Sequence, residues 1–255
     1  MGSKKVQSVD RALDILEILV EVQRPITLSE LSKRADLNIS TAHRLLNTLV
    51  MRGFAAQEES GKYKLGLHLF EIAGTLENSM DLKTVVKPYL EEIVEECNET
   101  VNLVILDQGE VLYVDQVEST NMIRMFANVG SRGPAHSLGA GKVLLAHLDE
   151  EQLDQILDQI ELKEFTTNTI TDPAKLKEEL AKIRELDYAV DFEEMEEGVR
   201  CVAAPIRDGN GEVVAAISVS GPNIRITEQV LYEELVPLIT NKAEEISSKL
   251  ANLGL

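Results

Sequence analysis

Apolar residues near the start of the chain recur every three to four positions in three successive segments, as they do in amphipathic helices. Segment 6–22 forms the first predicted helix, and a proline follows it within three residues. Thr27 then begins a second helix, where Glu30 three residues later is typical of a capping box. The third helix is predicted to begin near Ser40 and to end at Gly53. Two short helices joined by a tight turn are typical of a helix-turn-helix.

The third predicted helix has a polar outer face, whose side chains are of the kinds that contact nucleic acid. The guanidinium of Arg44 suits guanine, and the amide of Asn47 suits adenine. Ser40 and Thr41 lie at the helix start, where free N–H groups and the helix dipole favour a phosphate. We expect double-stranded DNA to be bound by the following residues: Thr27, Ser40, Thr41, His43, Arg44, Asn47, Lys62 and Lys64.

A β-hairpin is predicted over residues 54–66, because two short strand-like runs flank the turn sequence Glu-Glu-Ser-Gly. A hairpin in this place is typical of the wing of a winged helix-turn-helix. Any solvated helix has a polar face, but three helices followed by a hairpin favour DNA binding. We therefore expect a DNA-binding domain over 6–66 and an amphipathic linker helix over 67–80.

From residue 81 the pattern alternates between helical spacing and short continuous apolar runs. Strands are predicted over 101–119 (a hairpin), 123–127, 188–192, 199–207 and 213–220, with a loop over 130–134. Helices are predicted over 81–97, 139–148, 149–158, 172–186 and 228–251. Strands paired by hairpins favour an antiparallel sheet, so residues 81–253 are expected to form an α+β domain. We expect its helices on one face of the sheet and a ligand cup on the other.

Charge is distributed unevenly along the chain, whose formal net charge is -19. Residues 1–65 contain ten Lys and Arg against eight Asp and Glu, which leaves the remainder with 15 basic and 36 acidic residues. A nearly neutral head can still neutralise phosphates with a few placed cations, while the acidic body repels the duplex. Two cysteines without CxxC or HExxH motifs predict neither disulfides nor a metal site. No cofactor is expected, and no apolar run is long enough to span a membrane, so we expect a cytoplasmic protein.

Three linked motifs resemble the IclR family of bacterial transcription regulators. They are STAHRLLNTL with the following YKLG, AHSLGAGKVLLA over 135–146, and GVRCVAAPIRDGNGEVVAAISVSGP over 198–222. The resemblance covers residues 6–251 in the correct order. It implies a winged helix-turn-helix, a GAF-like effector domain, and homodimers that often pair into tetramers.

In that family the effector pocket is lined by the segment that leads into the GxGK helix and by the cysteine-containing strands. The resemblance therefore implies effector binding by Gly139, Ala140, Asp191, Cys201, Ser218 and Ser220.

These residue types suit a small organic acid. Gly139 and Ala140 open a predicted helix, so their N–H groups are free to bind a carboxylate. Ser218 and Ser220 alternate along a strand and project from one face, while Asp191 either accepts from a ligand hydroxyl or repels a second acid group. The absence of Trp favours an aliphatic acid, although sugar acids and aromatic acids remain open.

The sequence thus predicts a ligand-responsive DNA-binding regulator, expected to be a repressor and not an enzyme. Two other functions stay open at this point. In the first, Cys201 with a nearby His and Asp forms a nucleophile, and the head only tethers an enzyme to DNA. In the second, the chain bridges DNA without sensing a ligand.

Overall fold

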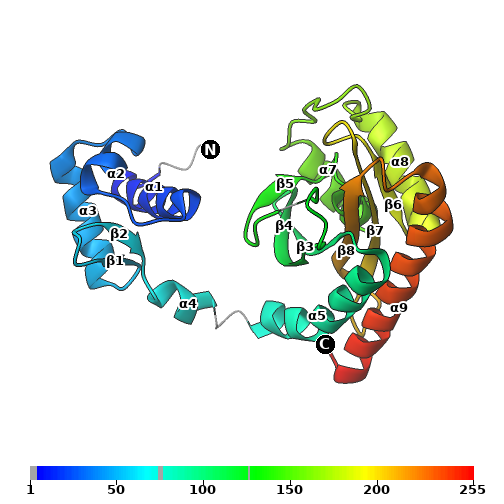
Figure 1. Ribbon diagram of the computed structural model, residues 1–255. Coiled ribbons are helices and arrows are strands. Elements are labelled where there is room, and N and C mark those ends of the chain that lie inside the picture. The colour runs from blue at the N-terminus through cyan, green and yellow to red at the C-terminus, as the bar shows by residue number, and fades with distance from the viewer. Residues whose placement is uncertain (1–4, 74–76, 126) are drawn as a thin grey trace. The chain divides into compact units, whose positions relative to one another are not determined.

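The computed structural model describes residues 5–73, 77–125 and 127–255, with the backbone alone for residues 77–81. Contacts within the chain divide it into two compact units, Met1–Glu77 and Asn78–Leu255 (Figure 1). Among the described residues, no helix combines the length and the apolar character that crossing a bilayer requires.

The first unit has the element order of a winged helix-turn-helix, as predicted. Its elements are α1 (Gln7–Val22), α2 (Leu28–Arg34), α3 (Ile39–Met51), β1 (Ala55–Gln57), β2 (Tyr63–Leu65) and α4 (His68–Ala73). The apolar faces of α1, α2 and α3 enclose a core with the wing: Ile15, Leu19, Ile26, Leu31, Ala42, Leu46, Leu49, Ala55 and Tyr63. A β-bridge between Ile26 and Tyr63 joins the wing to the segment before α2. This core holds α3 and the wing in fixed positions within the unit.

Thr27 caps α2, but only one half of the predicted capping box forms. The hydroxyl of Thr27 accepts a hydrogen bond from the N–H of Glu30 at 3.2 Å. The carboxylate of Glu30 bonds the guanidinium of Arg24 instead, with Oε1 lying 2.7 Å from a guanidinium nitrogen. The Arg24 guanidinium competes well for the Glu30 carboxylate because an ion pair is a stronger hydrogen bond than a backbone contact.

The second unit is built on a six-stranded antiparallel sheet with the strand order β5-β4-β3-β8-β7-β6. The strands are β3 (Thr100–Asp107), β4 (Glu110–Val117), β5 (Arg132–Pro134), β6 (Ala189–Phe192), β7 (Val199–Arg207) and β8 (Val213–Pro222). The helices are α5 (Glu77–Cys97), α6 (Gly139–Ala146), α7 (Glu150–Leu157), α8 (Pro173–Leu186), a π-helix η1 (Val230–Leu235) and α9 (Val236–Leu253). Helices and an antiparallel sheet in one unit agree with the predicted α+β class.

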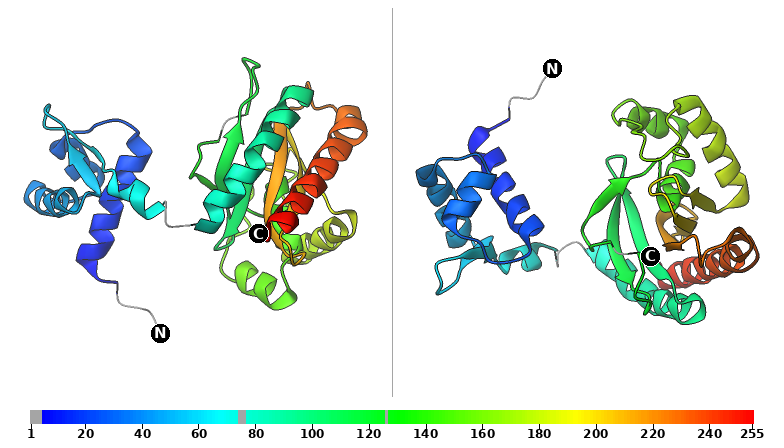
Figure 2. Two further views of the ribbon diagram at one scale, coloured as in Figure 1. Left: turned by 90° about the horizontal axis from the view of Figure 1, so that it is seen from below. Right: turned by 45° about the horizontal axis from the view of Figure 1, so that its top comes forward.

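Helices cover both faces of this sheet, so the prediction of helices on one face is wrong. Helices α5 and α9 lie side by side over one face, around a core that includes Leu90, Leu103 and Ile239 (Figure 2). Helices α6, α7 and α8 pack on the other face, around Leu145 and Leu176. Apolar residues on both sides of the central strands require cover on both sides. The predicted cup therefore shares its face of the sheet with α6.

The strand predicted over 123–127 is also wrong for the residues described there. Residues 123–125 and 127 have no strand geometry, and residue 126 lies outside the described residues. The strand that pairs with the outer side of β4 is β5, which lies within the segment predicted to be a loop. Side-chain and backbone bonds hold the segment before it: the Thr100 hydroxyl donates to the Met125 carbonyl at 2.8 Å.

The predicted linker helix over 67–80 falls partly on residues 74–76, which lie outside the described residues. On either side of them, α4 ends at Ala73 and α5 begins at Glu77.

Candidate DNA-binding surface and effector pocket

Helix α3 begins at a well-formed cap. The side-chain oxygen of Asn38 accepts from the N–H of Thr41 at 2.8 Å and from the hydroxyl of Ser40 at 2.9 Å. The cap thus uses two donors that the sequence had suggested for a phosphate. Thr41 is half-buried, whereas Ser40 is exposed. Asn38 was missed as a functional residue, although asparagine directly before a helical pattern is itself a capping signal.

The outer face of α3 presents the predicted recognition residues to solvent. His43, Arg44 and Asn47 are exposed, and in the described part of the chain no hydrogen bond or ion pair is recorded for their side chains. Thr48 differs, because its hydroxyl donates to the carbonyl of Arg44 at 3.0 Å. Three unengaged polar side chains on one helix face are available to bases and phosphates.

The two predicted wing lysines differ in their surroundings. Lys64 is exposed, and its ammonium lies 3.1 Å from the carboxylate of Glu58. Lys62 is also exposed, and no ion pair is recorded for it within the described residues. An exposed pair contributes little stability and is screened by salt, so a phosphate can replace Glu58 as the partner of Lys64.

The second unit contains a pocket between the sheet and the start of α6. Five of the six predicted effector residues line it: Ala140, Asp191, Cys201, Ser218 and Ser220. Gly139 packs directly behind it, since a Cβ at this position would lie 3.3 Å from the Asp191 nitrogen and 3.5 Å from the Cys201 Sγ. A side chain at position 139 would therefore sit tightly between α6 and the strands β6 and β7.

Ten further residues line the pocket and were not predicted. They are Asn102, Val104, Tyr113, Gln116, Met125, Ala127, Leu138, Met195, Glu196 and Val199. The cavity volume is about 80 Å³, several times the space that one water molecule needs, so a molecule with a few non-hydrogen atoms can enter. A signal for Asn102 and Gln116 does exist, because each is a polar residue inside an apolar strand run.

Three polar side chains of the pocket form a row across β4, β3 and β8. The Nε2 of Gln116 donates to Oδ1 of Asn102 at 2.8 Å, and Nδ2 of Asn102 donates to the Ser218 hydroxyl at 3.3 Å. With its amide turned by half a rotation, Gln116 would bond both the N–H and the carbonyl of Ala127 at 3.0 Å, while its oxygen would still lie 2.8 Å from the Asn102 side chain. Each amide can thus present either a donor or an acceptor, which suits the mixed polarity of an organic acid.

Burial controls the charge of the ionisable groups in the pocket. Burial raises the pKa of Asp191 to about 7, although its Oδ1 accepts from the Glu194 N–H at 2.7 Å. Burial likewise raises the pKa of Cys201 to about 12 and that of Tyr113 to about 12. At neutral pH the Cys201 thiol is therefore protonated, which is the unreactive form of a cysteine.

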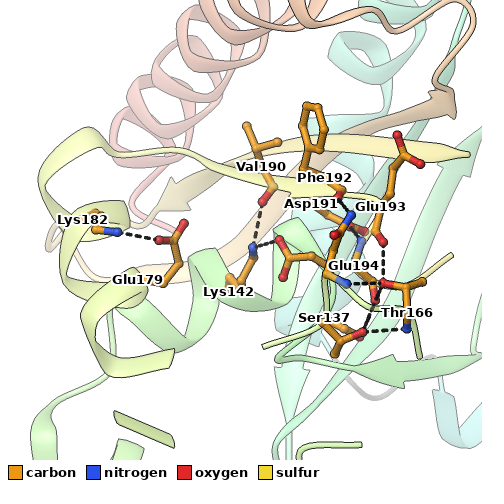
Figure 3. A network of polar contacts seen from close by, with 12 residues as sticks. Ser137, Lys142, Thr166, Glu179, Lys182, Val190, Asp191, Phe192, Glu193 and Glu194 are labelled. Atoms are coloured by element: carbon orange, nitrogen blue, oxygen red, sulfur yellow. Dashed lines mark hydrogen bonds and ion pairs between the residues drawn. The ribbon is translucent and has the colours of Figure 1, made fainter. Parts of the chain in front are cut away.

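A buried ion pair lies next to Asp191. The ammonium of Lys142, from α6, pairs with the carboxylate of Glu194 and donates to the Val190 carbonyl at 2.8 Å (Figure 3). The hydroxyl of Thr166 donates to the Glu193 carbonyl at 2.7 Å and so ties down the same segment. The start of α6 and the segment after β6 are thus joined beside the pocket. Within the described residues, no cluster of three or more His, Cys, Asp or Glu side chains is arranged to hold a metal ion.

A winged helix-turn-helix with a free recognition face, on the same chain as an α+β unit whose pocket is lined by apolar and polar side chains, defines a ligand-responsive DNA-binding transcription regulator. Two family models match the sequence: "Bacterial transcriptional regulator IclR C-terminal" over residues 75–248 and "IclR helix-turn-helix domain" over residues 8–59. The chain belongs to the IclR family of bacterial transcriptional regulators, so the resemblance seen in its motifs is confirmed.

Similar proteins cover both units. The transcriptional repressor IclR of Escherichia coli strain K12 is 40% identical over 246 residues, which cover 95% of this chain and 89% of that protein. The crystal structure of Thermotoga maritima IclR is 35% identical with a TM-score of 0.79, covering 97% of this chain and 100% of that one. An IclR homologue from Microbacterium hydrocarbonoxydans, complexed with 4-hydroxybenzoate, is 29% identical with a TM-score of 0.84, covering 96% and 99%. The predicted regulator function and α+β fold class are confirmed at the level of the family.

Proposed function

We propose that this chain is a non-enzymatic repressor whose DNA binding is altered when a small organic acid enters the pocket of the second unit. In this proposal residues 6–66 bind the operator, 67–80 link the domains, and the GAF-like domain 81–253 binds the effector in the cytoplasm. One observation carries the effector part: Ala140, Asp191, Cys201, Ser218 and Ser220, distant in sequence, line a single pocket.

The polar groups of this pocket suit a carboxylate. The hydroxyls of Ser218 and Ser220 face it from β8, and the first N–H groups of α6 are without partners inside the helix. Its small volume favours an aliphatic acid over an aromatic one. The homologue solved with 4-hydroxybenzoate supports an organic acid as the chemical class.

On the DNA side, we propose that Ser40, His43, Arg44 and Asn47 contact the major groove. Thr27, Thr41, Lys62 and Lys64 would then contact the sugar-phosphate backbone. A homodimer would place two α3 helices on a pseudo-palindromic operator with half-sites about 10 bp apart, or a multiple of that. The names of relatives support repression, because the protein from Escherichia coli is a transcriptional repressor.

The cysteine-dependent enzyme is less well supported by the site. A nucleophilic cysteine needs a thiolate near neutral pH, and burial raises the pKa of Cys201 to about 12. The relatives are likewise transcription regulators.

The test is a titration of labelled DNA from the promoters beside its own gene, with and without a panel of small acids. We expect nanomolar binding to one promoter and a shift in affinity with one acid. Ser220→Ala should bind the same DNA but lose the response, while Ser248→Ala, an exposed serine of α9 outside the pocket, should keep it. Binding to none of these promoters would contradict the proposal.

A further inference from the structure

The charged side chains that line the pocket are acidic. Asp191 and Glu196 are the only charged residues among those described in its lining, and no Lys or Arg is among them. Asp191 is buried, with 2% of its surface exposed, whereas Glu196 is exposed to solvent. An anionic effector, the class on which this inference rests through the proposed function, would therefore approach a buried carboxylate.

The charged groups around Asp191 add no net positive charge that could balance an anionic ligand. From α6, Lys142 is already paired with Glu194 of the segment after β6, so the two together are neutral. From β7 and β4, Cys201 and Tyr113 face Asp191, and both stay uncharged near neutral pH because burial raises the pKa of each to about 12. Asp191 is therefore the group of this cluster whose pKa burial raises to about 7, close to neutral pH.

Two negative charges cannot be held side by side in a buried site at low cost, and the usual outcome is that one of them takes up a proton. A protonated carboxyl is also a hydrogen-bond donor, whereas a carboxylate only accepts. We propose that an acid effector enters the pocket together with one proton, which Asp191 takes up and donates in a hydrogen bond to a ligand oxygen. The carboxylate of the ligand is then left to the serines of β8 and the N-terminus of α6.

The pH range of this coupling follows from the protein before the effector binds, in which burial raises the pKa of Asp191 to about 7. Below about pH 6 the proton is already present, so binding takes up none. At pH 7.5 about three-quarters of the Asp191 side chains are ionised, and binding takes up that fraction of a proton. Above this range the apparent affinity falls about tenfold for each pH unit, which amounts to roughly thirtyfold between pH 6 and 8.5.

The experiment is isothermal titration calorimetry of the full chain with pyruvate, lactate and glycerate, which are all fully ionised across this range. At pH 7.5 the binding heats measured in Tris and in MOPS should differ by about three-quarters of the difference between the ionisation enthalpies of these two buffers. The dissociation constant of pyruvate, which has a carbonyl acceptor and no hydroxyl donor, should rise roughly thirtyfold between pH 6 and 8.5. Equal heats in both buffers with a constant affinity would overturn the inference and leave the proposed function intact.

Two isosteric variants locate the proton. Asp191→Asn keeps an oxygen that can accept from the Glu194 N–H but cannot titrate, so its affinity should vary less than twofold over the same pH range. Glu196→Gln removes the other lining carboxylate and should keep the dependence of the wild-type protein. If Asp191→Asn fails to fold, the buffer comparison on the wild-type protein still decides. No heat from any of the three acids at pH 6 would instead contradict the acid-effector function, and this inference with it.

Discussion

The ammonium of Lys142 and the carboxylate of Glu194 form an ion pair in the interior of the second unit, where the lysine side chain is 1% exposed. The pair joins helix α6 to the segment that follows β6, and Asp191 lies beside it (Figure 3). The second carboxylate oxygen of Glu194 has no hydrogen-bond partner among the described residues. Burial raises the pKa of Glu194 despite the attraction of Lys142. The structure therefore depends on both partners being present.

Removing one partner should cost more than removing both. Lys142→Met leaves the Glu194 carboxylate buried without a counter-charge, and we expect a loss of roughly 3–5 kcal/mol in the free energy of unfolding. The double variant Lys142→Met with Glu194→Leu should recover more than half of that loss, because no unpaired charge remains. Urea unfolding followed by circular dichroism measures both. Equal stability of the single and double variants would show that the pair is not coupled.

Asp191 makes the stability of the effector-free protein depend on pH. Burial raises its pKa to about 7 in the folded protein from the ordinary value of 3.8, so between these values only the folded state holds the proton. The free energy of unfolding therefore falls as the pH rises from about 4 to 7, and it stays lower above that. Asp191→Asn removes this loss. The stability of Asp191→Asn relative to that of the wild-type protein should therefore be higher at pH 8 than at pH 5, by on the order of 2.5 kcal/mol.

Urea unfolding of the two proteins at pH 5 and pH 8 checks that difference, and because every other titrating group is common to both, their contributions cancel. A difference in stability that is the same at the two pH values would show that Asp191 titrates normally.

Asn38 should affect DNA binding without touching DNA. Its side chain caps α3 by accepting from the Thr41 N–H at 2.8 Å. Asn38→Ala should cost about 1 kcal/mol of stability and fray the first turn, which carries Ser40. Operator affinity should fall severalfold, as measured by fluorescence anisotropy. Asn38→Ser retains a capping hydroxyl and should bind nearly as well as the wild-type protein; an equal loss in both variants would indicate that Asn38 contacts DNA directly.

Replacing Arg44 and replacing Lys62 should change DNA binding in different ways, because a base contact affects sequence preference and a phosphate contact affects the salt dependence of affinity. Arg44→Ala should weaken binding to the operator by roughly five- to a hundredfold and relax the preference for one base. Lys62→Ala should weaken binding to all sequences alike and reduce the slope of log affinity against log salt by about 0.9. Lys182→Ala, an exposed lysine of α8 in the other unit, is the control for removing one positive charge. Unchanged operator affinity of Arg44→Ala would remove Arg44 from the recognition surface.

The pattern of apolar residues predicted the bounds of an element closely where a segment consists mainly of apolar residues. The strand predicted over 199–207 is β7, with the same bounds, because its run of apolar residues is buried from both faces of the sheet. The wrong strand over 123–127 has a physical reason as well. The apolar residues described there are not in a sheet: Met125 lines the pocket, and Ile123 is 67% exposed. Strand β5 has three residues, one glycine and one proline, so no alternation could reveal it.

The amino-acid sequence by itself determined the winged helix-turn-helix, the α+β class, the family, and the residues that its motifs carry. All of these depend on spacing along the chain, which hydrophobic periodicity and turn residues report directly. Only the tertiary structure decided that helices cover both faces of the sheet and that Asn102, Gln116 and Met195 join the pocket. It also decided that Lys142 pairs with Glu194, so that Asp191 has no ion-pair partner of its own among the described residues. The charge state of a buried group depends on desolvation and on neighbours brought together from distant segments, and no local pattern contains that information.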